Sequence, residues 1–386
     1  MKKVLKKVLN SNWITFGVVI IFIATAILTG VSIYKIVRSD APDFGVLWSA
    51  SRDLLASKNL YINKLLYTGV GYPPNTLLFY LPFTIVSYHI AQEIFIFLTV
   101  ASLIISTYLS LALVSKKVSS NTFLLITAMV FLSFPTKYTL GMGQNNAISL
   151  LLILLSLYFF VNKKESVSGV FLGLSIALKT IFGFFIFYYF LKFKWRLLAI
   201  SLFVIAISVL LVTAISHTQI NLYEYYITEV IPPLLNFEGR EIYYNQGIVG
   251  FVSRLVDDLT SRKSINGILS LILVSPVLFF NYLKKEKILL GFSAFIISLL
   301  LIDTLSWQHH FIWLIFPFIV LGSESIKSRK YGLLLLILTS YLLVGWNFKN
   351  PLLYLQFPKV LLLSNTFYGT ILLLFINLYF LAKQKK

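Results

Sequence analysis

The stretch WITFGVVIIFIATAILTGVSIY, residues 13 to 34, runs for 22 positions without a charged side chain. At about 1.5 Å of rise per residue, a helix of this length crosses a hydrocarbon layer of about 30 Å. The flank MKKVLKK resembles the start of a signal peptide, but the run is longer than a typical signal-peptide core and no A-x-A-like cleavage site closes it. The stretch therefore predicts an uncleaved first membrane span.

The composition of the whole chain leads to the same class. Of its 386 residues, 58% are hydrophobic and 12% are charged, and the mean hydropathy is +0.86. A soluble globule cannot bury that much apolar surface, so the sequence predicts an all-α polytopic membrane protein. The chain contains no cysteine, which excludes disulfides, thiolate metal sites and thiol catalysis.

The basic residues lie at the edges of the apolar runs, so the net charge of +19 does not indicate a nucleic-acid partner. Lys and Arg in short loops stay on the cytoplasmic side of a membrane. Seven short clusters hold 20 of the 33 basic residues: Lys2, Lys3, Lys6 and Lys7; Lys116 and Lys117; Lys163 and Lys164; Lys192, Lys194 and Arg196; Lys284, Lys285 and Lys287; Lys327, Arg329 and Lys330; Lys383, Lys385 and Lys386.

One threading places all seven clusters in the cytoplasm. It treats residues 1–386 as a single integral domain of a plasma membrane, with both termini on the cytoplasmic side. Several of its spans are shorter than the ~17 residues usually needed. The pair 167–178 and 180–191 has an alternative, a single long helix with Lys179 in its middle. Residues 73–88 either re-enter or lie in the interface, or else span fully. The twelve spans are 13–34, 91–114, 121–136, 147–161, 167–178, 180–191, 197–215, 265–282, 288–304, 311–322, 331–346 and 366–382.

The same threading sends a polar set to the outer face. It comprises the loops 35–72 and 216–264, the turns LGMGQNN and SWQHH, and Lys179. Wet outer loops are polar in any case, but Asp43, Lys179 and the two histidines lie near membrane depth, where ionisable groups tend to be functional. Ten of the fourteen acidic residues also lie outside: Asp40, Asp43, Asp53, Glu224, Glu229, Glu238, Glu241, Asp257, Asp258 and Asp303.

The first outer loop contains a candidate interfacial helix. Pro42 suits the first position of a helix, so one interpretation makes Asp43 a first-turn residue favoured by the helix dipole, with Asp40 as the cap-like alternative. The other holds the Asp43 carboxylate at headgroup level, between a water-borne hydroxyl and a lipid-borne group. The apolar residues that fall roughly on one face are Phe44, Leu47, Trp48, Leu54 and Leu55, which predicts a segment on the membrane surface.

An ordered set of motifs resembles glycosyltransferase family 87 of the GT-C superfamily. The set covers about residues 40–320, and its specificity lies in the order, because each motif is common alone. The motifs are Asp43-Phe44, NLY (59–61), GYPP (71–74), LP (81–82), GMGQNNAISLLLILL, SGVFLGLSIALKT, NQGIVGFVSRL (245–255) and SWQHHFIWLIFP (306–317).

The resemblance implies a GT-C-like fold and a membrane-embedded glycosyltransferase of the cell envelope. Such enzymes take a sugar from a polyprenyl phosphate and attach it to a lipid or glycan acceptor on the outer face. An aspartate in the first outer loop is their catalytic base, and Asp43 matches it here, with Asp40 as the fallback. The family is best known for alpha-mannosyl transfer in glycolipid biosynthesis, so a hexose such as mannose is expected, although pentose-transferring relatives exist.

The residue types suit this chemistry independently. In a single displacement, a carboxylate removes the proton of the acceptor hydroxyl as it attacks the anomeric carbon. Negative charge then grows on the leaving phosphate, and preorganised cations or donors stabilise it. The candidates for that role are Lys179, His309, His310, Arg240 and Arg254, of which Lys179 and the histidines are favoured because they end predicted spans. A snorkelling lysine and an interfacial histidine pair are the alternative interpretations.

Sugar and acceptor contacts are expected from amide and aromatic side chains. Gln144, Asn145 and Asn146 suit sugar hydroxyls and equally suit a cap of the following helix. The further candidates are Tyr72, Asn245 and Gln246. The tyrosine-rich loop from His217 to Ser264 suits an acceptor, or simply anchors in the interface.

No cofactor and no metal are expected. The chain has no DxD triplet, although Asp40 and Asp43 with an outer histidine could hold a cation by analogy with metal-using GT-C oligosaccharyltransferases. Two close carboxylates would also suit a double displacement, which ranks below the single displacement. The competing function is a transporter or flippase of lipids or lipid-linked sugars that uses the same polar groups.

Overall fold

The computed structural model describes residues 12–61, 71–216 and 221–383. Within these ranges the regular structure is α-, 3₁₀- and π-helical, with one isolated β-bridge between Asn245 and Trp307. The predicted all-α class is confirmed. The basic residues Lys2, Lys3, Lys6, Lys7, Lys385 and Lys386 and the start of the tyrosine-rich loop at His217 lie outside the described residues.

Every predicted span falls on an apolar helix. Six candidate spans of the described chain are long enough to cross a membrane: α2 (Asn12–Val37), α4 (Tyr88–Val114), α10 (Trp195–Ile215), α14 (Leu259–Leu283), η5 with α16 (Gln308–Leu314 and Ile315–Lys327) and η7 with α18 (Lys359–Ser364 and Asn365–Ala382). A seventh is α5 (Ser120–Leu132) with α6 (Phe134–Met142), bent by 63°. The chain is therefore a polytopic membrane protein.

Shorter apolar helices occupy the remaining predicted spans. They are α7 (Asn146–Val161), α8 (Glu165–Leu178), η3 with α9 (Thr180–Phe184 and Phe185–Leu191), α15 (Ile288–Ile302) and α17 (Tyr331–Gly345). Each has 10 to 17 residues, fewer than a full crossing normally takes. The count of twelve crossings stays a prediction.

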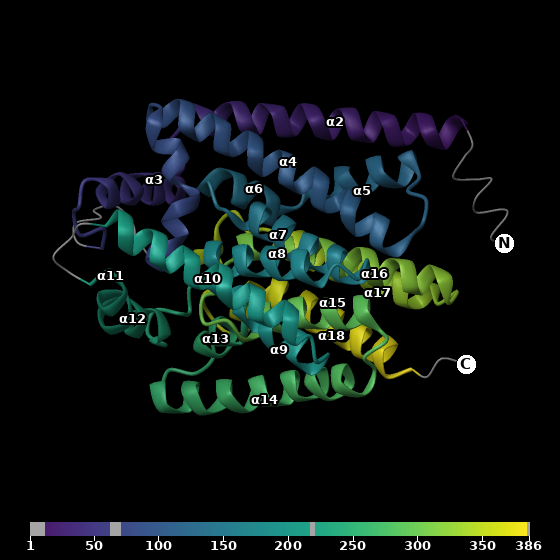
Figure 1. The fold of residues 1–386 in the computed structure, drawn as a ribbon. Helices are drawn as coiled ribbons and strands as arrows, with labels where there is room; N and C mark the ends of the chain where they lie inside the picture. The colour runs from purple at the N-terminus through teal and green to yellow at the C-terminus, as the bar shows by residue number, and fades with distance from the viewer. Residues whose placement is uncertain (1–11, 62–70, 217–220, 384–386) are drawn as a thin grey trace.

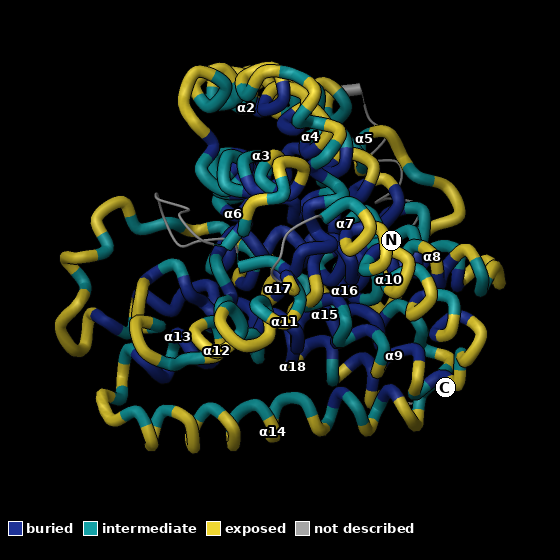
Figure 2. The backbone as a smooth tube through the Cα atoms, turned by 60° about the vertical axis from the view of Figure 1, so that its left-hand side comes forward, coloured by how far each residue is buried: buried dark blue, intermediate teal, exposed yellow. Residues whose placement is uncertain are grey.

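The helices lie side by side with two distinct ends (Figure 1). At one end gather α3 (Pro42–Leu55), α11 (Leu222–Tyr225) and α12 (Ile231–Leu235), while α2 begins and α18 ends at the other. Figure 2 shows α2 and α14 as exposed outer helices, with the buried residues concentrated between them. Only 11% of the most apolar window of either outer helix is buried, against 72% for η5 with α16. The outer helices are therefore the ones whose apolar surface faces lipid.

The basic clusters that lie within the described residues share the end where α18 finishes. Lys192 Nζ donates to the carbonyl of Lys285, and Lys287 Nζ to that of Phe380, each at 3.0 Å. Lys327 Nζ donates to the carbonyl of Val114 at 3.2 Å. A lysine near a helix C-terminus satisfies carbonyls that the helix leaves unpaired. Positive charge is thereby collected at one face of the bundle.

The segment 167–191 is a hairpin of two helices, so the alternative of one long helix is wrong. Lys194 Nζ lies 2.6 Å from Glu165 Oε1, which joins the turn between α9 and α10 to the beginning of α8. The chain turns at Lys179, whose backbone is extended. On the other side, α8 packs closely on α10: a Cβ at Gly173 would lie 2.7 Å from the carbonyl oxygen of Ser201. Small residues at such contacts let membrane helices approach.

Residues 73–88 form no helix long enough to cross a membrane, which argues against the alternative of a full crossing. They form η1 (Pro74–Phe79) and η2 (Leu81–Ile85), and at about 2 Å of rise per residue a 3₁₀ turn of this length covers only a fraction of the hydrocarbon layer. Asn75 Nδ2 donates to the carbonyl of Ala177 at 3.0 Å, next to the end of α8. The segment is a short helical element packed against α8, and its re-entrant or interfacial placement stays a prediction.

The helix after the first span forms as expected, with two corrections. Pro42 opens α3 and Asp43 lies in its first turn, but the N-cap is Ala41, so the alternative that makes Asp40 the cap is wrong. Asp40 is exposed. Most of the apolar face packs on protein: Phe44 is fully buried among the rings of Tyr80, Phe83, Tyr88 and Phe95, whereas Leu55 is exposed.

Candidate active site

A chain of hydrogen bonds begins at Asp43. The Nε2 of Gln144 donates to Oδ2 of Asp43 at 2.5 Å. The hydroxyl of Tyr72 donates to Oε1 of the same glutamine at 3.1 Å and accepts from Lys179 Nζ at 3.3 Å. Three segments distant in sequence therefore converge on the first turn of α3.

Lys179 is the centre of this cluster. Its ammonium donates to Oδ1 of Asn146 at 2.5 Å and lies 5.5 Å from the ring centres of both Tyr72 and Trp313. The side chain is only 5% exposed. A snorkelling lysine would keep its charge in water. Burial beside two aromatic rings contradicts that interpretation, because the ammonium is held among rings and polar groups inside the protein.

Asn146 connects the lysine to the histidine turn. Its Nδ2 donates to the carbonyl of His309 at 3.1 Å, and its own carbonyl accepts from Nε1 of Trp313 at 3.0 Å. Thr139 Oγ1 also donates to the carbonyl of His309, at 3.0 Å. An unbroken series of hydrogen bonds thus runs from residue 43 to residue 309.

Both histidines of η5 are buried beside this series. The His309 ring lies 5.0 Å from the Tyr138 ring and 4.7 Å from that of His310. The His310 ring is stacked on Trp313, with centroids 5.1 Å apart and planes within 6°. Within the described part of the chain, neither Nδ1 has a hydrogen-bond partner. Two imidazoles with an unused nitrogen at a buried cation are suited to a polar ligand.

Gly143 explains how α3 reaches the cluster. It ends α6 in the left-handed conformation, with φ of +67°, which favours glycine. A Cβ there would lie 2.6 Å from Cβ of Phe44 and 2.9 Å from Cβ of Ala41. The turn predicted from GMG therefore both ends the helix and leaves room for the start of α3, which places Gln144 against Asp43.

The environment of Asp43 changes its acidity. Burial raises the pKa of the Asp43 carboxyl above its usual value. The hydrogen bond from Gln144 and the charge of Lys179 act in the opposite direction and lower that pKa. A carboxylate whose proton affinity is raised is a better general base than a free aspartate, provided that it remains ionised at the working pH.

Four of the predicted site residues stabilise the outer loop instead of joining the hydrogen-bond series. Arg240 donates to the carbonyls of Pro233, Leu234 and Asn236, and Arg254 to those of Ile242 and Asn245 and to Ser364 Oγ. Asn245 Nδ2 donates to the carbonyls of Arg240 and Thr304. Gln246 links Tyr243, Leu363 and Phe367. The sequence selected these four residues only because their side chains are polar. A polar side chain alone does not distinguish a residue that binds a ligand from one that supports a loop.

Asn145 and Asp40 occupy different places. Asn145 is buried at the N-cap of α7, and its side chain forms no capping hydrogen bond, so the cap interpretation of the amide turn is not supported there. Asp40 is exposed and two residues before the start of α3, outside the hydrogen-bond series.

Sequence reasoning missed three participants. Asp303 ends α15 with its Oδ2 3.9 Å from Nδ1 of His310. Trp313 lies between His310 and Lys179, and Tyr138 contacts His309. Trp313 lies inside the SWQHHFIWLIFP motif, and Asp303 precedes that motif by three residues. Their position in or near the histidine turn is the sequence feature from which Asp303 and Trp313 could have been predicted.

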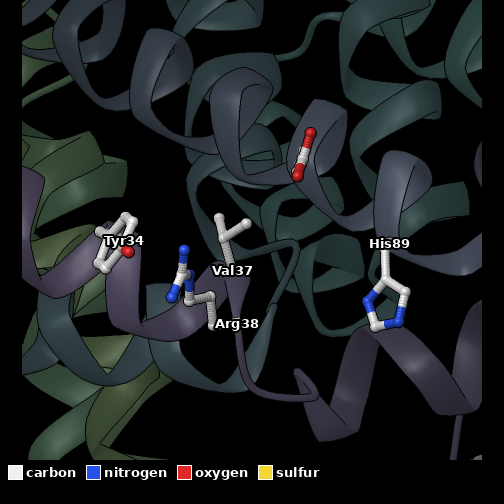
Figure 3. A pocket seen from close by; sticks show the side chains of 5 residues that line it. Tyr34, Val37, Arg38 and His89 are labelled. Atoms are coloured by element: carbon white, nitrogen blue, oxygen red, sulfur yellow. The ribbon is translucent and has the colours of Figure 1, made fainter.

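A separate groove lies at the outer flank, between the end of α2 and the start of α4 (Figure 3). Tyr34, Val37, Arg38 and His89 line it, together with Glu93. The Arg38 guanidinium lies over the Tyr34 ring at 4.4 Å. None of these side chains belongs to the series from Asp43 to His309. Nowhere in the described residues are three His, Asp or Glu side chains grouped so that they could hold a metal ion.

Two comparisons with known proteins bear on this cluster. The family model described as Glycosyltransferase family 87 matches residues 70–319. A polyprenol-phosphate-mannose-dependent alpha-(1-2)-phosphatidylinositol mannoside mannosyltransferase of Mycobacterium tuberculosis is 23% identical over 357 residues, covering 86% of this chain and 81% of that protein. The matched region contains Tyr72, Gln144, Lys179 and His309, whereas Asp43 lies before it.

Proposed function

The chain belongs to glycosyltransferase family 87, and from that premise we propose that it transfers mannose from a polyprenyl-phosphate donor to a lipid or glycan acceptor at the outer face of a plasma membrane. Family membership makes the protein a membrane glycosyltransferase rather than a transporter. The mannose and the donor come from the printed activity of a relative that is 23% identical. A phosphatidylinositol mannoside is the acceptor of that relative, and here the acceptor class is a membrane glycolipid.

The observation that carries the mechanism is the hydrogen-bonded series from Asp43 through Lys179 to the carbonyl of His309. It places one carboxylate and one buried cation in the same cluster without an ion pair between them. A single displacement needs those two groups on opposite parts of the reacting bond. The arrangement supports Asp43 as the base and Lys179 as the phosphate ligand.

The step proceeds as one exchange of bonds. The acceptor hydroxyl loses its proton to the Asp43 carboxylate while its oxygen forms a bond to the anomeric carbon. The bond from that carbon to the phosphate oxygen breaks, and the electron pair stays on the phosphate, which leaves as polyprenyl phosphate. The ammonium of Lys179 and the imidazoles of His309 and His310 stabilise the charge that grows there. No metal or cofactor takes part in this scheme.

Tyr72, Gln144 and Asn146 belong to the hydrogen-bonded series that joins base and cation, and with the neighbouring Asn145 we propose them as contacts to sugar hydroxyls. Gln144 has the further effect of orienting the carboxylate. Arg240, Arg254, Asn245 and Gln246 enter the proposal as supports that hold the outer loop over the site, because their donors are engaged with backbone carbonyls and Ser364. The basic end of the bundle is cytoplasmic in this proposal, so the site faces outward.

The test compares two aspartates three residues apart. Purified protein in liposomes receives labelled polyprenyl-phosphate mannose and a glycolipid acceptor, and new glycosidic product is measured. Asp43→Asn lowers the rate by about 10²- to 10⁴-fold, the range expected when a general base is lost. Asp40→Asn, at an exposed position, leaves the rate within twofold. Transfer by Asp43→Asn at the wild-type rate eliminates the base assignment, and loss only in Asp40→Asn moves it to the fallback residue.

A further inference from the structure

A second carboxylate, that of Asp303, interacts electrostatically with Lys179 as Asp43 does. Asp303 is the C-cap residue of α15, and its side chain is 20% exposed. Burial lowers the pKa of Lys179, and the charges of Asp303 and Asp43 both act in the opposite direction. One lysine therefore interacts with two carboxylates that are far apart in sequence. A scheme with one base uses only Asp43.

The contacts of Asp303 point to His310. The Oδ2 atom lies 3.9 Å from Nδ1 of that histidine, which has no hydrogen-bond partner in the described part of the chain. The backbone N–H groups of Thr304 and Leu305 face the same carboxylate and fix its position at the turn. A small closure would bring the pair to hydrogen-bond distance. Carboxylates commonly fix the tautomer and orientation of an imidazole in this way.

The imidazole in turn shares an aromatic partner with the lysine. The ring of His310 is parallel to that of Trp313, and the Lys179 ammonium lies 5.5 Å from the same indole. A phosphate bound at Lys179 would therefore neighbour His310. The titratable groups facing that histidine are Asp303, Lys179 and His309. Of these only Asp303 favours a protonated ring, and an arriving phosphate anion adds to its effect.

We infer that Asp303 is a positioning residue for the departure of the donor phosphate, acting through His310. The inference rests on the proposed function. When the donor phosphate is bound, His310 takes up a proton from water, donates a hydrogen bond from Nδ1–H to Asp303 and one from Nε2–H to the phosphate oxygen that receives the electron pair of the broken sugar bond, and keeps both protons through the step. The acceptor proton goes separately to Asp43. Each proton and electron pair has one origin and one destination, so the step balances.

The experiment measures kcat and KM for the donor in proteoliposomes. Asp303→Asn keeps oxygen and nitrogen at the turn but removes the charge, and kcat falls by about 10- to 100-fold with donor KM within threefold. Asp303→Glu restores part of kcat, because it restores a carboxylate. His310→Gln gives a similar loss. The double variant is no slower than His310→Gln alone, since Asp303 acts through that ring. Asp257→Asn, an exposed outer carboxylate, is the matched control.

Three outcomes would overturn the inference. One is Asp303→Asn with kcat within twofold of wild type, and another is a double variant whose loss is the product of the two single losses. The third is equal loss in Asp303→Asn and Asp303→Glu with a lowered melting temperature, which would assign Asp303 to the turn alone. If Asp303→Asn does not fold, a wild-type kcat in His310→Gln overturns the inference in its place. Failure of the proposed function differs, because wild-type protein would then transfer no mannose.

Discussion

The amide of Gln144 donates to the carboxylate of Asp43 at 2.5 Å although 101 positions separate the two residues. The bond joins the turn after α6 to the first turn of α3. It engages Oδ2 of the carboxylate, and in the proposed reaction Oδ1 would take the proton of the acceptor hydroxyl. Since an amide cannot give up its proton, Gln144 can support the base without competing for the proton that the reaction releases.

Replacing Gln144 should shift the acidic limb of the pH–rate profile. The hydrogen bond lowers the Asp43 pKa, which burial raises. Gln144→Met removes the lowering contribution, so the Asp43 pKa rises and the carboxylate becomes protonated at a higher pH. The limb of kcat/KM that reports the base therefore moves toward higher pH, as measured by transfer rates across an acidic-to-neutral series. A limb that moves toward lower pH, or does not move, contradicts the assignment of Asp43 to that limb.

Removal of the buried cation should reduce the rate of the chemical step. Lys179→Met leaves a side chain of similar length without charge, and we expect kcat to fall by about 10²- to 10³-fold, as for loss of one preorganised group at a developing anion. The same change removes a charge that lowers the Asp43 pKa, so the acidic limb should also move toward higher pH. Lys263→Met, far along the chain on exposed α14, is the control. Unchanged kcat in Lys179→Met would place the phosphate elsewhere.

Two glycines of one motif should differ in their tolerance of alanine. Gly143→Ala introduces a Cβ at 2.6 Å from Cβ of Phe44 in a left-handed backbone, and we expect a loss of about 1–3 kcal/mol in stability together with weak activity. Gly141→Ala introduces a Cβ with nothing within 4 Å, inside a helix, and should be neutral or slightly stabilising. Thermal unfolding in detergent measures both. Equal tolerance of the two changes would mean that α3 does not rest on the turn.

The absence of native cysteine permits a direct test of orientation. Single cysteines at the exposed positions Glu238 and Asp257 should react with an impermeant thiol reagent added to intact cells. Cysteines at the exposed positions Ser119 and Ser328, beside the basic clusters, should react only after permeabilisation. Labelling of all four from one side would contradict the threading, and the reverse pattern would place the candidate site in the cytoplasm.

The sequence by itself determined the class of the protein, the apolar runs that become helices, and many of the polar residues that meet in the hydrogen-bonded series. Hydropathy and helical periodicity are local properties, so they predicted α3 and the turn at Gly143 without knowledge of the rest of the chain. Residue type also selected Asp43, Lys179 and His309. Charge counted along short loops predicted that the basic clusters share one face.

Only the tertiary structure decided which polar groups meet. Lys179 is joined to Tyr72 and Asn146, 107 and 33 positions away, and no local pattern encodes such pairs. The same holds for Arg254 and Gln246, whose type suits a ligand but whose buried donors are taken by backbone groups and Ser364. A buried polar group must find a partner wherever the packing of helices puts one. Because of that packing, Lys179 lies at the centre of a hydrogen-bonded cluster, whereas Arg254 and Gln246 stabilise a loop.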